Sequence, residues 1–135
     1  MSKKDQTTEI KVRLNVTDFS CRPNEIGRIL GLRSSKTWRA GEKIESTIRL
    51  HKQNGWRLDS GLTKGSIEQK VKFLISKIQP KLKAFKRLPP HAAIELSCII
   101  YTRSDHRPAI SFPREALKTL SEIGASIDID LYILN

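Results

Sequence analysis

The chain has 135 residues, enough for one domain with its own core, and 38% of them are hydrophobic, which excludes a disordered tail. No apolar run is long enough to cross a bilayer, and the first residues lack the apolar stretch of a signal peptide. We therefore expect a cytoplasmic protein with no membrane partner. The formal net charge of +11 instead indicates an anionic partner.

The positive charge is concentrated in the middle of the chain. Residues 22–87 contain 17 Lys/Arg and 5 Asp/Glu, whereas the remaining residues contain 8 and 9. This asymmetry predicts one electropositive face rather than a uniformly basic surface. A basic surface that serves only solubility is the alternative interpretation.

The first half of the chain begins with a polar segment, residues 1–7, that we expect to be flexible. Residues 9–16, "EIKVRLNV", alternate apolar and polar side chains, which predicts a strand with one buried face. A short helix is expected to start at Pro23 and stop at Gly31. Residues 33–43 are interpreted as a polar loop with Trp38 at its centre.

Residues 45–60, "ESTIRLHKQNGWRLDS", predict two strands joined at Asn54-Gly55, a dipeptide typical of hairpin turns. A three-residue loop sets Leu50 opposite Leu58, which is preferable to setting an apolar side chain opposite a charged one. In that register one buried face is formed by Ile48, Leu50, Trp56 and Leu58. We expect Trp56 to anchor the core.

The second half begins with a helix whose first turn has the Ser66 and Gln69 spacing of a capping box, and Pro80 should kink or restart it. A strand is expected over 93–102, a short strand or an approach to the next element over 109–112, a helix over 113–124 and a final strand over 126–134. The inward-facing residues of the final strand are predicted to be Ile127, Ile129, Leu131 and Ile133.

These elements predict an α+β fold with the order β-α-β-β-α-β-α-β. We expect residues 8–135 to form a single domain in which a largely antiparallel sheet carries its helices on one face.

Four segments together resemble a family found in bacteria and phages that is called domain of unknown function 4279. They are "NEIGRILGL", "WRLDSGL", "IEQKVKFLISKIQPKLKAF" and "ISFPREALKTLSEIGASIDIDLYIL", so the similarity runs from about residue 10 across most of the chain. The resemblance implies a small α+β domain of bacteria or their mobile elements. It implies no catalytic residue, and the basic middle is not a general property of the family.

Candidate catalytic and metal-binding patterns are weak. Asp59 and Ser60 point to opposite faces of a strand and lack the strand-turn-helix setting of a serine nucleophile, so a strand end is the better interpretation. Asp128 and Asp130 share one face of the last strand and could hold a divalent ion, but charges that protect an edge strand explain them better. The distant Cys21 and Cys98 predict free thiols. We therefore expect no enzyme, no cofactor and no metal.

The candidate partner-binding residues lie in the basic middle. On a helical wheel Lys70, Lys77 and Lys81 flank the apolar stripe of the second helix, outside the core. An aromatic side chain among cations, as at Trp38, could stack on a base or fill a partner's pocket, although it could equally fold onto its own domain. The full set is Lys70, Lys72, Lys77, Lys81, Lys83, Lys86, Arg87, Arg33, Lys36, Trp38 and Arg39.

The functional hypothesis is a non-catalytic binding protein whose basic face engages an acidic protein surface or a ribonucleoprotein. We favour an inhibitor of a bacterial defence ribonucleoprotein of the CRISPR type. An immunity protein against a bacterial toxin and a direct binder of RNA or DNA remain the alternatives.

Overall fold

The computed structural model describes residues 8–61 and 64–135. In chain order the elements are β1 (Thr8–Thr17), α1 (Pro23–Leu30), β2 (Lys36–Trp38), β3 (Gly55–Asp59), α2 (Ile67–Ile78), the 3-10 turn η2 (Gln79–Lys81), α3 (Leu82–Phe85), β4 (Ala93–Arg103), α4 (Arg114–Glu122) and β5 (Ala125–Leu134). This α+β arrangement, with the predicted order of strands and helices, confirms the expected fold class.

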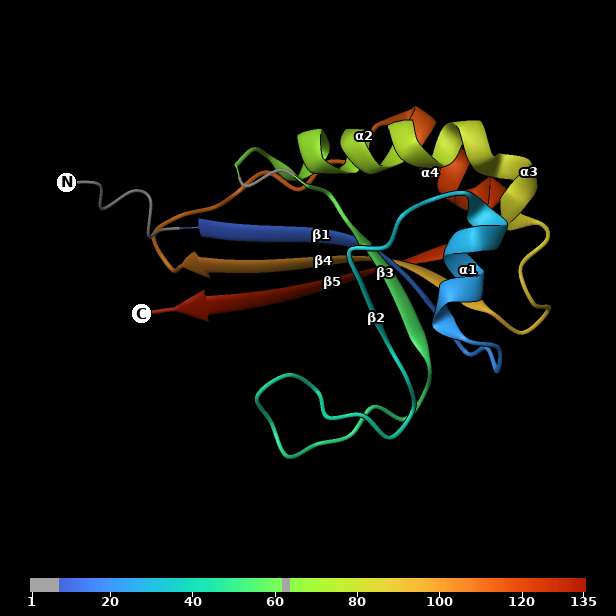
Figure 1. Ribbon diagram of the computed structural model, residues 1–135. Coiled ribbons are helices and arrows are strands. Elements are labelled where there is room, and N and C mark those ends of the chain that lie inside the picture. Colours follow the sequence, from blue (N-terminus) through green and yellow to red (C-terminus); the bar gives the residue numbers. More distant parts are fainter. Residues whose placement is uncertain (1–7, 62–63) are drawn as a thin grey trace.

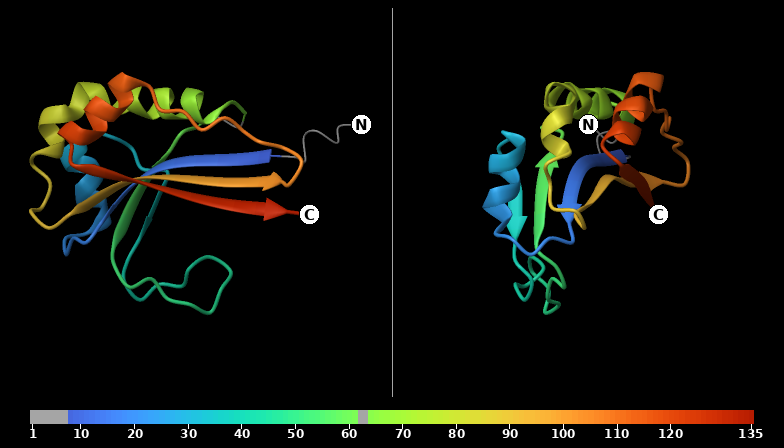
Figure 2. Two further views of the ribbon diagram at one scale, coloured as in Figure 1. Left: turned by 180° about the vertical axis from the view of Figure 1, so that it is seen from behind. Right: turned by 90° about the vertical axis from the view of Figure 1, so that its right-hand side faces the viewer.

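The strands form one five-stranded sheet in the order β2-β3-β1-β4-β5. Neighbours are antiparallel except β4 and β5, which run parallel because α4 carries the chain back between them. The helices cover one face of the twisted sheet, and the other face carries none of them (Figures 1 and 2).

β1 lies at the centre of the sheet, and its side chains alternate between the two faces of the sheet. Val12, Leu14 and Val16 are fully buried under the helices. The intervening Arg13 and Asn15 lie on the helix-free face, opposite Asp59 and Arg57 of β3. Strict alternation in the sequence therefore produces a core on one side and a polar surface on the other.

α2 begins at the predicted capping box. Ser66 Oγ accepts from the Gln69 amide at 3.2 Å, and Gln69 Oε1 accepts from the Ser66 amide at 2.8 Å. Pro80 ends the regular helix, and η2 turns the chain into α3. Apolar side chains at helical spacing along α2 are fully buried against the sheet: Ile67, Val71, Leu74 and Ile78.

The predicted hairpin around Asn54-Gly55 is wrong. The strand beside β3 is β2, and Trp56 pairs with Thr37 on one side and Val16 on the other. Residues 39–54 form a long excursion that extends away from the sheet, which we call the arm (Figure 1). Ile48 and Leu50, expected in the core, are 90% and 54% exposed on the arm.

Asn54 and Gly55 serve packing rather than a turn. The Asn54 side chain closes the base of the arm, because its amide donates to the carbonyls of Phe19 and Cys21 and its oxygen accepts from the Ala40 amide. Gly55 lies under the Trp38 indole, and a Cβ there would be 2.0 Å from the ring. Trp56, the next residue, is fully buried, which confirms it as the core anchor.

Two further expectations about the second half need correction. Residues 109–112 form no strand, so the alternative of an irregular approach to α4 is the correct one. The apolar row of β5 lies on the same face as the buried residues of β4, but it is not buried. β5 is a terminal strand of the sheet and little of the helical layer covers it, so exposure rises from 37% at Ile127 to 56% at Ile133.

We predict that Gly55→Ala will destabilise the protein by about 1–3 kcal/mol, because the new methyl group must displace the Trp38 ring. Urea unfolding of the single variants and of Gly55→Ala/Trp38→Ala gives a double-mutant cycle. The double variant should be no less stable than Trp38→Ala alone. Fully additive losses would show that Trp38 is not the group that Gly55 accommodates.

Candidate partner-binding surface

The longest stretch of uncompensated positive charge covers α2, η2 and α3. Residues 69–94 contain seven Lys/Arg and no Asp/Glu. No salt bridge in the described part of the chain involves the cations from residue 77 onwards. We call these cations the cationic ridge, which consists of Lys77, Lys81, Lys83, Lys86 and Arg87.

The ridge side chains are available at the surface to different extents. Lys83, Lys86 and Arg87 are exposed around α3 and its end. Lys77 is exposed and lies 5.5 Å from the centre of the Phe73 ring. Lys81 is half-buried, with its ammonium beside Gly31 at the carboxyl end of α1, where a cation is favourable.

Lys72, also on α2, is partly neutralised by a nearby acid, unlike the cations of the ridge. Its ammonium lies 3.1 Å from Glu68 one helical turn earlier, in an exposed ion pair of little energetic weight. It borders the ridge but contributes less unbalanced charge.

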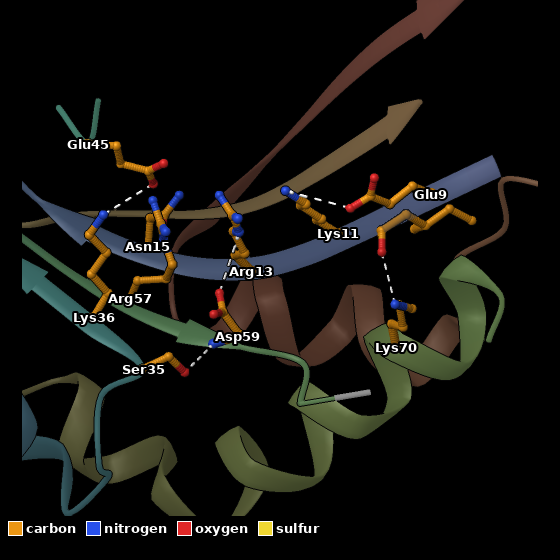
Figure 3. A network of polar contacts seen from close by, with 11 residues as sticks. Glu9, Lys11, Arg13, Asn15, Ser35, Lys36, Glu45, Arg57, Asp59 and Lys70 are labelled. Atoms are coloured by element: carbon orange, nitrogen blue, oxygen red, sulfur yellow. Dashed lines mark hydrogen bonds and ion pairs between the residues drawn. The ribbon is translucent and has the colours of Figure 1, made fainter. Parts of the chain in front are cut away.

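Lys70 does not belong to this surface, so its assignment as an exposed cation is wrong. It is only 3% exposed, and its ammonium donates to the Ile10 carbonyl of β1 at 2.9 Å (Figure 3). Burial lowers the pKa of the Lys70 amine, an effect that Glu9 partly opposes. Lys70 therefore connects α2 to the central strand.

The cations proposed around Trp38 are dispersed. Trp38 itself lies in β2 and is 9% exposed, with its ring stacked on His51 at 4.8 Å and Arg57 on the ring at 5.1 Å. Of the two interpretations of Trp38, the structure therefore shows the ring packed onto its own domain, and the expected loop at this position is a strand. Arg33 and Arg39 are exposed near β2.

Lys36 belongs to a polar network on the helix-free face of the sheet (Figure 3). Its ammonium lies 3.1 Å from Glu45 of the arm, and Arg13 lies 3.4 Å from Asp59. Arg57 donates to Asn15 Oδ1 at 3.4 Å. Burial, and to a smaller extent the charge of Arg13, lowers the pKa of the Arg57 guanidinium. Cations on this face are largely balanced by nearby acids, so it attracts an anion less than the ridge does.

The same face carries an aromatic pair that the sequence analysis missed. Tyr101 and Tyr132 stack at 5.1 Å, and the Lys11 ammonium lies 5.8 Å from the Tyr101 ring. They face each other because β4 and β5 pair in parallel register, which sequence periodicity alone does not reveal.

The positions considered for catalysis have structural partners. The Ser60 amide donates to the Val12 carbonyl and the Asp59 amide donates to Ser35 Oγ, so both residues close the end of β3. Cys21 and Cys98 are free thiols, and burial raises the pKa of Cys98 to about 11. Within residues 8–61 and 64–135 no group of His, Cys, Asp and Glu could hold a metal ion.

A groove of about 560 Å³ lies between α2 and α4. Its walls include Ile75 and Leu82, and Thr119 donates to Gln79 Oε1 at 2.5 Å beside them. Both Lys72 and Lys118 reach its rim, as do two glutamates, so the groove has no dominant charge.

Fold and surface together define a small α+β protein with a cationic ridge along one helical edge. The chain belongs to the family described as domain of unknown function (DUF4279), which it matches over residues 8–134. No curated protein and no solved structure matches it. No helix in the described part of the chain is long and apolar enough to cross a membrane.

We predict that Lys70→Glu and Lys77→Glu will differ sharply, although the two lysines lie two turns apart on the same helix. Lys70→Glu should destabilise the protein by about 2 kcal/mol or more, because a buried carboxylate replaces a donor to a carbonyl. Lys77→Glu should change stability by less than about 0.5 kcal/mol. Thermal melts measure both, and equal stability would contradict the burial of Lys70.

Proposed function

We propose that the protein is a non-catalytic binding protein that engages an anionic partner through the cationic ridge. The observation that carries this proposal is the absence of acidic residues from 69 to 94, together with the exposure of Lys83, Lys86 and Arg87. Folding does not require these three charges, since none takes part in an ion pair or a hydrogen bond from its side chain in the described part of the chain.

A nucleic-acid-containing assembly is the partner that this charge pattern fits best. Lysines that follow a helical edge can contact successive phosphates as point charges, and release of the phosphates' counterions drives such binding. The polar network on the opposite face contains nearly as many acids as bases, so it offers no comparable attraction.

The biological role that we propose is inhibition. A compact domain that covers part of the nucleic-acid path of a bacterial defence ribonucleoprotein, such as a CRISPR-type effector, would prevent that assembly from binding its target. The ridge supplies the attraction, while the shape of α3 and its surroundings would supply the selectivity for one assembly.

Reversal of the ridge charge should weaken binding without unfolding the protein. We expect Lys83→Glu/Lys86→Glu/Arg87→Glu to weaken binding to single-stranded RNA, or to a captured ribonucleoprotein, by tenfold or more at low salt. The difference from wild type should shrink as salt rises, because screening removes the same attraction. Fluorescence anisotropy at two salt concentrations measures this.

The matched control is Arg103→Glu/Arg107→Glu/Arg114→Glu, which changes the net charge equally at exposed positions outside the ridge. It should bind much more tightly than the ridge variant. Equal losses in the two variants would show that only the total charge matters and would overturn the ridge as the binding surface. Unchanged binding by a folded ridge variant would overturn it as well.

The inhibitory role has a separate test. Capture from a host lysate, with and without nuclease, should recover a ribonucleoprotein whose target cleavage falls when the wild-type protein is added and not when the ridge variant is added. Full cleavage activity in the presence of bound wild-type protein would contradict inhibition.

A further inference from the structure

Exposed large hydrophobic side chains are concentrated at two places away from the ridge. In the described part of the chain most of them lie on β5, and Ile48 and Leu50 lie on the arm. Those on β5 are Ile127, Ile129, Leu131, Tyr132, Ile133 and Leu134. A contiguous exposed apolar patch on a small protein indicates an interaction surface.

The β5 patch is an open sheet edge. β4 pairs with one side of β5, and among residues 8–61 and 64–135 no strand pairs with the other side. Its odd-numbered positions from Ile127 to Ile133 form an apolar row, and Asp128 and Asp130 lie on the opposite face.

The acidic side of this edge lacks compensating charge. Glu95 of β4 lies beside the two aspartates, and burial together with their charges raises its pKa. No salt bridge in the described ranges includes Glu95, Asp128 or Asp130. In a chain with a net charge of +11, this strand is a local acidic surface that a cation would stabilise.

The arm carries the complementary pattern. Ile48, Arg49 and Leu50 are all exposed at the tip, so this end of the arm presents two apolar side chains and a cation to solvent. A turn closed by the Ile44 amide and the Arg49 carbonyl at 2.8 Å, and by Thr47 Oγ1 and the Ile44 carbonyl at 2.7 Å, fixes the tip. Its base is held by Asn54, so the tip is presented as an ordered projection.

We propose that the arm of one copy docks on β5 of a second copy, with Ile48 and Leu50 on the apolar row and Arg49 beside Asp128 and Asp130. Exposed apolar side chains then meet exposed apolar side chains, and the cation of the tip meets the two aspartates of the edge. Each copy has one arm and one β5 edge, so a two-fold dimer uses both contacts reciprocally and closes.

A second copy fits this contact better than two other arrangements. The arm leaves the sheet from β2 and β3, at the edge opposite β5, so the two surfaces of one chain lie apart (Figure 2). Direct pairing of β5 with β5 of another copy would bring two acidic strands together, which is unfavourable.

Two variants that each fail to self-associate should associate when mixed. In the Arg49→Asp variant, the tip of the arm and the β5 edge both carry acidic side chains. In the Asp128→Lys/Asp130→Lys variant, the tip and the edge both carry basic side chains. Sedimentation velocity at about 0.15 M salt should show a concentration-dependent dimer for wild type and tenfold or greater weakening for each variant alone. The equimolar mixture should recover a species of twice the monomer mass, because each arm then meets an edge of opposite charge.

The control is Lys52→Asp, which makes the same charge change as Arg49→Asp at an exposed position near the base of the arm. It should dimerise like wild type, and unchanged melting temperatures should show that every variant is folded. A wild-type protein that stays monomeric at all concentrations, or a mixture that stays monomeric, would overturn the proposal. If Arg49→Asp does not weaken the dimer, the interface lies elsewhere on the protein, and this result would overturn the proposal too.

Discussion

The alternation of β1 is the constraint on which the rest of the structure depends. Its register with β3 and β4 fixes which side of every neighbouring strand faces the helices. A slip of one residue would bring Arg13 into the core and Val12 to the surface. α2 then adds a second connection to β1 by way of Lys70, whose buried ammonium reaches a carbonyl at the strand's end.

The charges of the molecule have two different physical roles. On the helix-free face, Arg13, Lys36 and Lys11 each lie beside an acid, so their fields are largely cancelled at short range. Along the ridge, consecutive cations have no acidic neighbour in the sequence. Attraction of a distant anion depends on uncompensated charge. The ridge is therefore the better candidate for recognition, although its side chains make fewer polar contacts than those of the helix-free face.

The ridge and the proposed arm-to-edge contact use separate parts of the molecule. α3 lies at the end of the helical layer, whereas the arm and the free end of β5 project away from that layer (Figure 1). A reciprocal dimer would therefore leave both ridges accessible. Two ridges on one particle would allow it to engage a long anionic surface at two points, which increases the overall affinity when the spacing fits.

Local sequence patterns determined much of this fold. The capping box at Ser66, the glycine stop at Gly31 and the alternation of residues 9–16 each depend on neighbouring residues, and each gives the predicted element. They also placed Trp56 in the core, and the uninterrupted run of cations identified most of the ridge.

Only the tertiary structure decided what covers each face. Lys70 and Lys77 occupy equivalent positions on the helical wheel, but β1 covers the first and solvent the second. Asn54-Gly55 suits a turn by local preference, yet the Trp38 ring requires the glycine beneath it and a different strand pairs with β3. β5 has the alternation of a half-buried strand, but it is the edge of the sheet and its apolar row remains exposed. Periodicity specifies which side chains share a face, whereas contacts between distant segments determine whether that face is buried.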